Sequence, residues 1–218
     1  MPKRLKLKLS ILYILQDMFM GGTDTTSTTM EWAMAELVKN PNVMKKAQEE
    51  VRRVVGEKLK VDETDIDQMD FLKCVIKETL RLHAPVMVTR ASSGSTKLED
   101  YDIPPGTGIL INAWAIQRDP KLWDRPEEFL PERFANNSID FKGHHEQFIP
   151  FGMGRRGCPG ISFAIIEAEC VLANLLYWFD WELPDGVTVN DLDMSEVYRL
   201  VIRKKIPLCL VPVLHSPS

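Results

Sequence analysis

Residues 151–160, FGMGRRGCPG, decide how this sequence is interpreted. They place a single cysteine, Cys158, in a loop with four glycines and just after two arginines. A cysteine binds a metal as the thiolate, which needs a positive or hydrogen-bond-donating environment. Glycines let the backbone approach a flat partner closely and leave amide groups to face the sulfur. The loop therefore suits a thiolate ligand beside an anionic cofactor, although a lone cysteine near a turn is more often a buried structural residue.

The segments next to the cysteine favour the first interpretation. Residues 161–179 are strongly apolar and have helical spacing, so a helix begins just after Cys158. The positive end of its dipole then favours an anionic sulfur. Arg156 is placed to bind a carboxylate through two parallel hydrogen bonds.

The composition is that of an ordinary globular protein and excludes several classes of function. Of the 218 residues, 44% are hydrophobic and 27% charged, which is enough for one large domain or two small ones. The formal net charge of −4 provides no broad basic surface, so we expect no nucleic-acid partner. The cysteines have no C-x-x-C spacing and do not cluster with histidines, so we expect neither a zinc site nor a disulfide framework.

Hydropathy gives no sign of a membrane segment. We find no apolar run of the roughly 18 residues that a spanning helix needs. Residues 11–20 are apolar, but Gln16 and Asp17 break the run and no signal-peptide cleavage site follows. The sequence therefore predicts no anchor or targeting segment within this chain.

The fold class that the spacing predicts is mainly α with a small β region. We expect a helix over 10–39 that is interrupted at Gly21 and Gly22, a second that starts at Pro41 and ends at Gly56, and a third over about 66–83. The first ten residues, MPKRLKLKLS, alternate lysine and leucine, which is a strand-like period that fits a helix start poorly.

The rest of the chain changes character twice. Residues 86–112 contain short β-like runs around a Pro-Pro-Gly turn, and 119–148 form an irregular meander rich in Pro, Asp, Glu and Asn. Two further β-like runs, FDWELP and IPLCLVPVL, close the sequence.

A polar cluster, GGTDTT at 21–26, stands inside the first helical segment. Gly21 and Thr25 are four residues apart and share a helix face. Glycine inside a helix costs about 1 kcal/mol relative to alanine, so two in succession suggest that another group approaches closely. Asp24 and Thr25 add a carboxyl and a hydroxyl there. By itself this pattern is better explained by a helix break or a surface polar cluster.

Two more motifs mean little when taken singly. Glu78 and Arg81, in ETLR, stand at i and i+3 of a helix and form a natural ion pair, as in many helices. PERF, at 131–134, contributes Arg133.

In this order, GGTDTT, ETLR, PERF and FGMGRRGCPG resemble the signatures of the cytochrome P-450 family. The haem-binding signature of that family is similar to the loop at five positions, which are Phe151, Gly154, Arg156, Cys158 and Gly160. Haem iron held by a cysteine thiolate is the established ligation in this family. The resemblance implies haem b as the cofactor and Cys158 as the axial ligand of its iron.

The other motifs acquire roles through the same resemblance. GGTDTT looks like the oxygen-activation motif of the long central helix, with Gly21 at the cofactor and the pair Asp24–Thr25 delivering protons to iron-bound dioxygen. Glu78, Arg81 and Arg133 are implied to form a structural cluster that locks the meander and positions the cysteine loop. The family's usual partner of a haem propionate corresponds to Arg90.

The sequence departs from the family pattern at two places. The linker HAPVMVTR, between His83 and Arg90, is shorter than usual in the family, which bears on the reach of Arg90. Arg199 stands where relatives tend to have a small residue, so its side chain would either narrow the substrate pocket or turn outward.

Stretches such as INAWAIQRDPKLW look like the plant enzymes of secondary metabolism, and the resemblance covers nearly the whole chain from about Gln16. It implies one partial domain over 1–218, the C-terminal, haem-binding half of the fold. The implied activity is a haem–thiolate monooxygenase that inserts one atom of O2 into a small lipophilic metabolite. Electrons would come from NADPH through NADPH–cytochrome P-450 reductase. Full-length members are anchored to the endoplasmic reticulum with the enzyme on the cytosolic face.

Two alternatives remain at this point. The chain could be a truncated, non-catalytic fragment that binds haem weakly or not at all, with apolar faces such as VLANLLYWF exposed and prone to association. It could also rearrange peroxides without a reductase, but relatives of that kind tend to lose the acid–alcohol pair, which is intact at Asp24 and Thr25.

Overall fold

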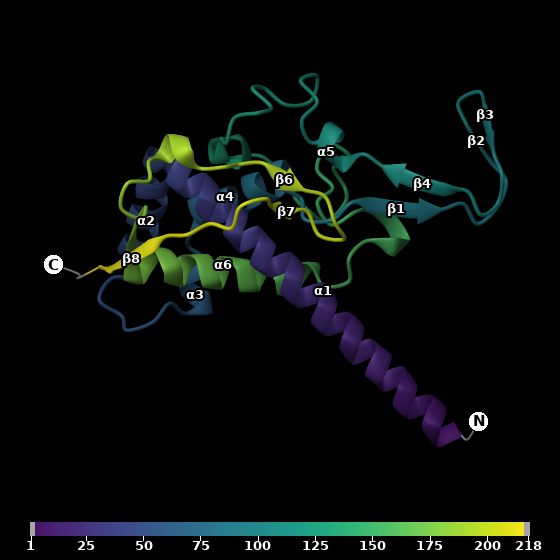
Figure 1. The fold of residues 1–218 in the computed structure, drawn as a ribbon, viewed down its shortest axis with the longest axis horizontal. Coiled ribbons are helices and arrows are strands. Elements are labelled where there is room, and N and C mark those ends of the chain that lie inside the picture. Colours follow the sequence, from purple (N-terminus) through teal and green to yellow (C-terminus); the bar gives the residue numbers. More distant parts are fainter. Residues whose placement is uncertain (1–2, 216–218) are drawn as a thin grey trace.

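A single long helix, α1 (Lys3–Lys39), runs diagonally across the molecule and organises the helical part of the fold (Figure 1). The structure is a computed structural model that describes residues 3–215, with side chains described from residue 10 onward. The C-terminal half of α1 packs against α2 (Pro41–Val55), α4 (Asp70–Leu82) and α6 (Ile161–Trp178). A short helix, α3 (Glu63–Ile66), contacts α6. The expected class, mainly α with a small β region, is confirmed.

The core lies where these four long helices meet. On α4 the apolar residues recur at helical spacing, so one side of the helix faces inward. The same holds for Val51 and Val55 on α2. The meander that follows adds an aromatic cluster of Trp123, Phe134 and Phe148, whose ring centroids lie 5.1–6.4 Å apart. The meander is therefore an ordered layer over α4.

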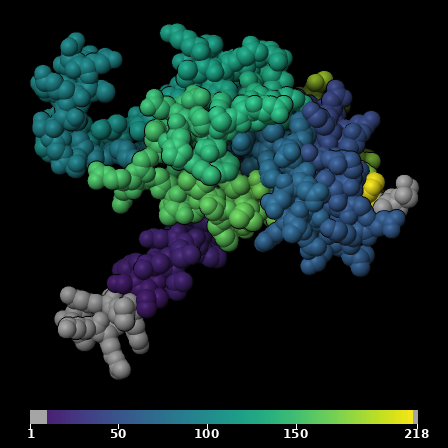
Figure 2. Space-filling view, turned by 180° about the vertical axis from the view of Figure 1, so that it is seen from behind, coloured from purple at the N-terminus to yellow at the C-terminus, as the bar shows by residue number. Residues whose placement is uncertain are grey.

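Within residues 3–215 the β region consists of four antiparallel pairs. They are β1 (Val88–Ala91) with β4 (Gly108–Ile111), β2 (Thr96–Leu98) with β3 (Tyr101–Ile103), β5 (Phe179–Glu182) with β8 (Val211–Leu214), and β6 (Glu196–Val197) with β7 (Arg203–Lys204). Between them lie α5 (Ala113–Ile116) and three 3-10 helices, η1 (Pro131–Phe134), η2 (Gly154–Arg156) and η3 (Val189–Asp191). The β2–β3 hairpin and the N-terminal part of α1 project from the main body (Figure 2).

Two expectations about the helices are wrong, and a third needs a new boundary. Gly21 and Gly22 do not interrupt α1, because neither adopts a positive φ and the helix continues on both sides. Residues 3–10 are helical in spite of their strand-like alternation, since they extend an existing helix and need no nucleation of their own. The third expected helix is present as α4, which begins four residues later than expected, with Met69 at its N-terminal boundary and the short α3 before it.

The exposed apolar surface also differs from the expectation. VLANLLYWF is not an exposed face, because Leu172, Ala173, Leu176 and Tyr177 are buried. Among the side chains described from residue 10 onward, the N-terminal part of α1 has eight large apolar ones that are each about half exposed or more; they are Ile11, Leu12, Tyr13, Ile14, Leu15, Met18, Phe19 and Met20. We call these residues the apolar arm of α1.

The expectation that no apolar run is long enough to span a membrane is wrong for helix α6. Its 18 residues have a mean hydropathy of 1.5, so by length and composition it could cross a membrane. Core helices of soluble proteins also have this composition, and α6 packs against α1, α2 and α4. The core accounts for the buried side of α6, while Phe163, Ile166 and Val171 remain exposed.

Candidate functional site

The loop around Cys158 is a tight turn that presents its sulfur outward. The amide of Cys158 donates to the carbonyl of Phe151 at 3.0 Å, and Gly157 donates to the carbonyl of Gly154 at 3.0 Å. Gly154 has φ +73°, a left-handed conformation that favours glycine. Cys158 itself is exposed. The backbone bonds therefore fix the loop while the thiol stays accessible.

Two features of the backbone place positive potential at the Cys158 sulfur. The amide of Gly160 points at Sγ, with 3.4 Å between the nitrogen and the sulfur. Helix α6 begins at the next residue, Ile161, so the positive end of its dipole faces the same atom. Both place positive potential at the sulfur, as a metal-bound thiolate needs.

Arg90 reaches the loop despite the short linker before it. It lies on β1, and its Nη2 donates to the carbonyl oxygens of Met153 at 3.4 Å and Arg156 at 3.3 Å. A side chain at Gly152 would place its Cβ 3.2 Å from that nitrogen, and Gly152 also has φ +69°. Arg90 thus lies against the backbone of the cysteine loop, and the side chain of Arg156 is exposed beside it.

The acid and alcohol of the GGTDTT motif make different contacts. Thr25 Oγ1 donates to the carbonyl of Gly21 at 2.6 Å, so the two residues that share a helix face are directly bonded. A Cβ at Gly21 would meet no atom within 4 Å, which leaves open space beside the helix at this point. Asp24 Oδ2 accepts from Nη2 of Arg203 on β7 at 2.8 Å, and this pair is about half exposed. The sequence did not indicate Arg203.

A small cavity of about 20 Å³ connects the motif with the cysteine loop. Thr25 and Thr26 line it from α1, Phe151 from the loop, and Ala164 and Ile165 from α6. Thr26 Oγ1 is buried there and has no hydrogen-bond partner among the described residues. The structure thus brings Thr25 and Phe151 together. It adds Thr26, which only the neighbouring TT dipeptide could have suggested.

Glu78, Arg81 and Arg133 form one buried cluster. Glu78 accepts from Arg81 Nε at 2.8 Å and Nη2 at 2.9 Å, and from Arg133 Nε at 2.9 Å. The backbone amide of Leu130 is a fourth donor, at 2.8 Å. Both arginines also bind backbone carbonyls of the meander, at Gln117, Asp124, Arg125, Pro126 and Glu128. Helix α4 is thereby tied to the meander at 117–133.

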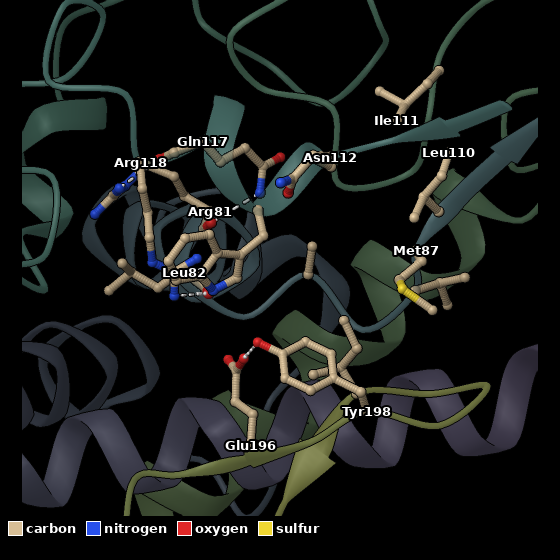
Figure 3. A pocket seen from close by; sticks show the side chains of 15 residues that line it. Arg81, Leu82, Met87, Leu110, Ile111, Asn112, Gln117, Arg118, Glu196 and Tyr198 are labelled. Carbon is tan, nitrogen blue, oxygen red and sulfur yellow. Dashed lines mark hydrogen bonds between the residues drawn. The ribbon is translucent and has the colours of Figure 1, made fainter.

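A larger cavity of about 280 Å³ lies elsewhere, between the β1–β4 pair and the β6–β7 hairpin (Figure 3). Met87, Leu110, Ile111 and Trp114 form much of its apolar wall, and Tyr198 lies across from them. Arg199 is exposed and is not among the lining residues, so its side chain does not narrow this cavity.

The donor set at Cys158 fits haem better than a bare metal ion. In the part of the chain that the structure describes, no group of three or more His, Cys, Asp or Glu side chains is arranged to hold a metal. The loop instead offers one accessible sulfur with backbone support, and a haem needs only one axial protein ligand of this type. The open space at Gly21 and the unpaired hydroxyl of Thr26 lie on the helix that faces this region.

Comparisons with known proteins agree with these observations. A family model described as Cytochrome P450 matches residues 8–210. The chain is 60% identical over 204 residues to Cytochrome P450 71A1 of Persea americana, and 55% identical over 208 residues to phenylacetaldehyde oxime monooxygenase of Prunus mume. These matches cover 93% and 94% of this chain but only 41% and 40% of the relatives.

A solved structure shows the same fold. A structure of a zebrafish cytochrome P450 with abiraterone superposes with a TM-score of 0.81 at 30% identity. The match covers 92% of this chain and 47% of the zebrafish protein. The chain thus spans less than half of each of these proteins, and the expected partial fold is confirmed.

Proposed function

Because this chain belongs to the cytochrome P450 family, we propose that it forms the haem-binding part of a monooxygenase in which Cys158 ligates the iron. One observation carries the proposal. The exposed sulfur of Cys158 receives the Gly160 amide at the start of α6, and Phe151 of the same loop shares a cavity with Thr25. These are the elements that a haem between the loop and α1 would need.

Each residue of the site has a defined task under this proposal. Cys158 would supply the axial thiolate, which the Gly160 amide and the α6 dipole stabilise. Arg90 and Arg156 would bind carboxylates of the cofactor, as guanidinium groups commonly do. When bound, the haem would supply the redox chemistry that transfers one atom of O2 to the substrate.

Thr25 and Asp24 would control a proton. The hydroxyl proton of Thr25 is held by the Gly21 carbonyl in this structure, which orients Oγ1 towards the side of α1 that is open at Gly21. The Asp24 carboxylate is half exposed, pairs with Arg203 and precedes Thr25 in the helix. Under this proposal the pair of Asp24 and Thr25 transfers a proton from solvent to the open face of α1, for which Asp24 would have to leave Arg203.

The proposed substrate is a small lipophilic plant metabolite, with electrons from NADPH through a flavin-containing reductase. The relatives named above support the class, since one is a monooxygenase whose name gives a small aromatic oxime as substrate. For the complete protein we propose the endoplasmic reticulum membrane, cytosolic face, as in the family.

The test is the absorption spectrum of the reduced, carbon-monoxide-bound chain after haem addition. We expect the red-shifted Soret band of thiolate-ligated haem, and its loss in Cys158→Ser. Cys209→Ser is the matched control because Cys209 is also exposed but lies outside the loop. Haem uptake with a band at shorter wavelength, or no uptake by the chain, would favour the alternative of a non-catalytic fragment.

A second measurement concerns proton delivery in the complete enzyme. Thr25→Ala is expected to keep haem but to release peroxide, with less product per NADPH and a rate of product formation about 100-fold lower or more, the range for loss of a general acid. Thr23→Ala, on the same helix and exposed, is the control. Unchanged coupling of NADPH use to product in Thr25→Ala would refute the role.

A further inference from the structure

His83 lies in a buried cluster of charged groups that the proposed function does not use. It follows directly after α4 and is 7% exposed. Its Nε2 lies 2.8 Å from Glu36 Oε1 on α1, and its Nδ1 lies 3.2 Å from Glu196 Oε1 on β6. One imidazole thus connects α1 with the β6–β7 hairpin.

An indole ring completes the environment of His83. The fully buried Trp32 of α1 stacks on the imidazole, with ring centroids 3.9 Å apart and planes 3° from parallel. Lys204 Nζ lies 4.9 Å from the Trp32 ring centroid and donates to the carbonyl of Asp193. Lys204 is 6% exposed, and burial lowers the pKa of its ammonium group. The stack is therefore enclosed by α1, the end of α4 and the hairpin.

The contacts place one carboxylate at each nitrogen of the His83 ring. Neutral imidazole has one donor and one acceptor nitrogen, so when both glutamates are ionised, each finds a donor only if His83 carries two N–H groups. Although burial opposes it, the hydrogen bond from His83 lowers the pKa of Glu196. With Lys204, the two cations balance the carboxylates of Glu36 and Glu196, which a buried cluster requires. Arg118, after α5, adds its attraction to Glu196.

The carboxylate of Glu196 also connects the cluster to the cavity of about 280 Å³. Glu196 Oε2 accepts from the hydroxyl of Tyr198 at 3.1 Å (Figure 3). Glu196, Tyr198 and Ile202 line the cavity from the hairpin side. The amide of Ile202 donates to the carbonyl of Pro85 at 2.7 Å, just after His83. The hairpin is thus one wall of the cavity, and it is fastened next to His83.

We infer that His83 is a positioning residue that clamps the hairpin 196–204 between α1 and the cavity, and so fixes the Tyr198 hydroxyl in the cavity wall. The clamp is the series Glu36–His83–Glu196–Tyr198, in which each group holds the next by a hydrogen bond. It holds the hairpin only while both ring nitrogens carry protons. Loss of the clamp would let the hairpin 196–204 move, and the loop at Cys158 would keep its structure.

The first test uses the stacked indole as a reporter in the haem-free chain. A protonated imidazole in contact with an indole quenches its fluorescence, so the Trp32 emission, obtained by subtracting the Trp32→Phe spectrum, should rise when His83 loses a proton. We expect this titration in the wild type and its absence in His83→Phe, which keeps the ring stack. Glu196→Gln should move the midpoint to lower pH. A pH-independent Trp32 emission in the wild type would overturn the inference.

The second test measures amide hydrogen exchange over 196–204. His83→Phe is expected to accelerate exchange there at least ten-fold, while α6 is unchanged. Because His83→Phe leaves Glu36 buried without its partner, Glu196→Gln serves as a second variant that breaks the clamp from the other side. Arg203→Ala, which removes only the half-exposed pair with Asp24, is the control and should change exchange little. Wild-type exchange rates in Glu196→Gln would overturn the clamp.

Both tests are independent of haem and of turnover. Failure of haem binding at Cys158 would leave the fluorescence and exchange results unaffected. Failure of the clamp would likewise leave the proposed ligation intact.

Discussion

Glu78 is a buried carboxylate whose loss of hydration is compensated by hydrogen bonds. It has no exposed surface, yet its oxygens receive four hydrogen bonds, from Arg81, Arg133 and the amide of Leu130. Removing one partner of a buried ion pair costs far more than the pair contributes, because the remaining charge stays out of water. Arg81, which is also fully buried, would be that remaining charge.

We therefore expect Glu78→Ala to lower the free energy of unfolding by about 3–5 kcal/mol. Urea denaturation followed by circular dichroism measures the change. Glu132→Ala, in the PERF turn next to Arg133, is the control because the pair of Glu132 with Lys46 is about half exposed on both sides. That variant should lose less than about 1 kcal/mol. Equal losses in the two variants would contradict the assignment.

Glu169 on α6 is a buried carboxylate without such compensation. It is 9% exposed, and burial raises its pKa above the usual value of 4.5, although Lys73 attracts it. Since the folded-state pKa is the higher one, the ionised form costs stability at neutral pH, and this cost disappears as pH falls through the unfolded value.

Glu169→Gln should accordingly stabilise the chain at pH 7, by on the order of 1 kcal/mol. The gain should vanish near pH 4, where the carboxyl is protonated in both states. Thermal melts at both pH values measure it. Glu167→Gln, on the same helix and only half buried, is the control for helix propensity. A gain that persists undiminished at pH 4 would show that burial of charge is not the cause.

Among single residues, those whose chemistry depends on local spacing could be predicted. Cys158 and its glycines lie within ten positions, so the tight turn and the adjoining helix are evident from sequence. His83 is different, because its partners at Glu36 and Glu196 are 47 and 113 residues away. A lone histidine after a helix gives no sign of such contacts, and Arg203 at Asp24 is a case of the same kind.

Among the elements, α1 has two halves with opposite environments. Its C-terminal half is buried on nearly every side, with Trp32, Ala33, Ala35 and Leu37 fully enclosed. The apolar arm has no such cover, and its residues point in all directions around the helix. A helix that is apolar all round is stable in water only when other surfaces enclose it, so the arm favours contact between copies of this chain.

Lysine at positions 12 and 19 should therefore reduce self-association. The double variant Leu12→Lys/Phe19→Lys is expected to move the sedimentation profile towards the monomer, with little effect on the unfolding temperature, because both side chains are mostly exposed. Leu59→Lys is the control, since Leu59 is 87% exposed but stands alone in a loop. Equal profiles for the wild type and the double variant would exclude the arm as the contact.

The elements also show where local patterns fail. Glycine pairs and a strand-like alternation both predicted the wrong state within α1, because a continuing helix overrides weak local preferences. The β region was foreseen only as short runs. The strands FDWE (β5) and VPVL (β8) pair with each other although they are far apart in the sequence. Tertiary contacts determine this pairing, and the alternation of apolar and polar residues does not encode it.

For the whole molecule, the order of the motifs along the chain carried the most information. Four short patterns in sequence identified the family and hence the fold class, whereas composition and net charge only excluded other classes. What composition could not provide was the distribution of exposed apolar surface. This distribution depends on which faces of α1 pack against other segments of the 218-residue chain, and not on how apolar the helix is.

The Glu78 cluster also imposes an order on biosynthesis. Arg133 is added to the growing polypeptide 55 residues after Glu78, and the bonds between them close α4 against the meander. At ribosomal speeds of about 5–20 residues per second, the interval is about 3–11 seconds. During it, Arg81 and Glu78 have each other but not the carbonyls and amide of the later segment. Until the PERF turn has emerged, α4 can pack against α1 and α2 but lacks these bonds to the meander.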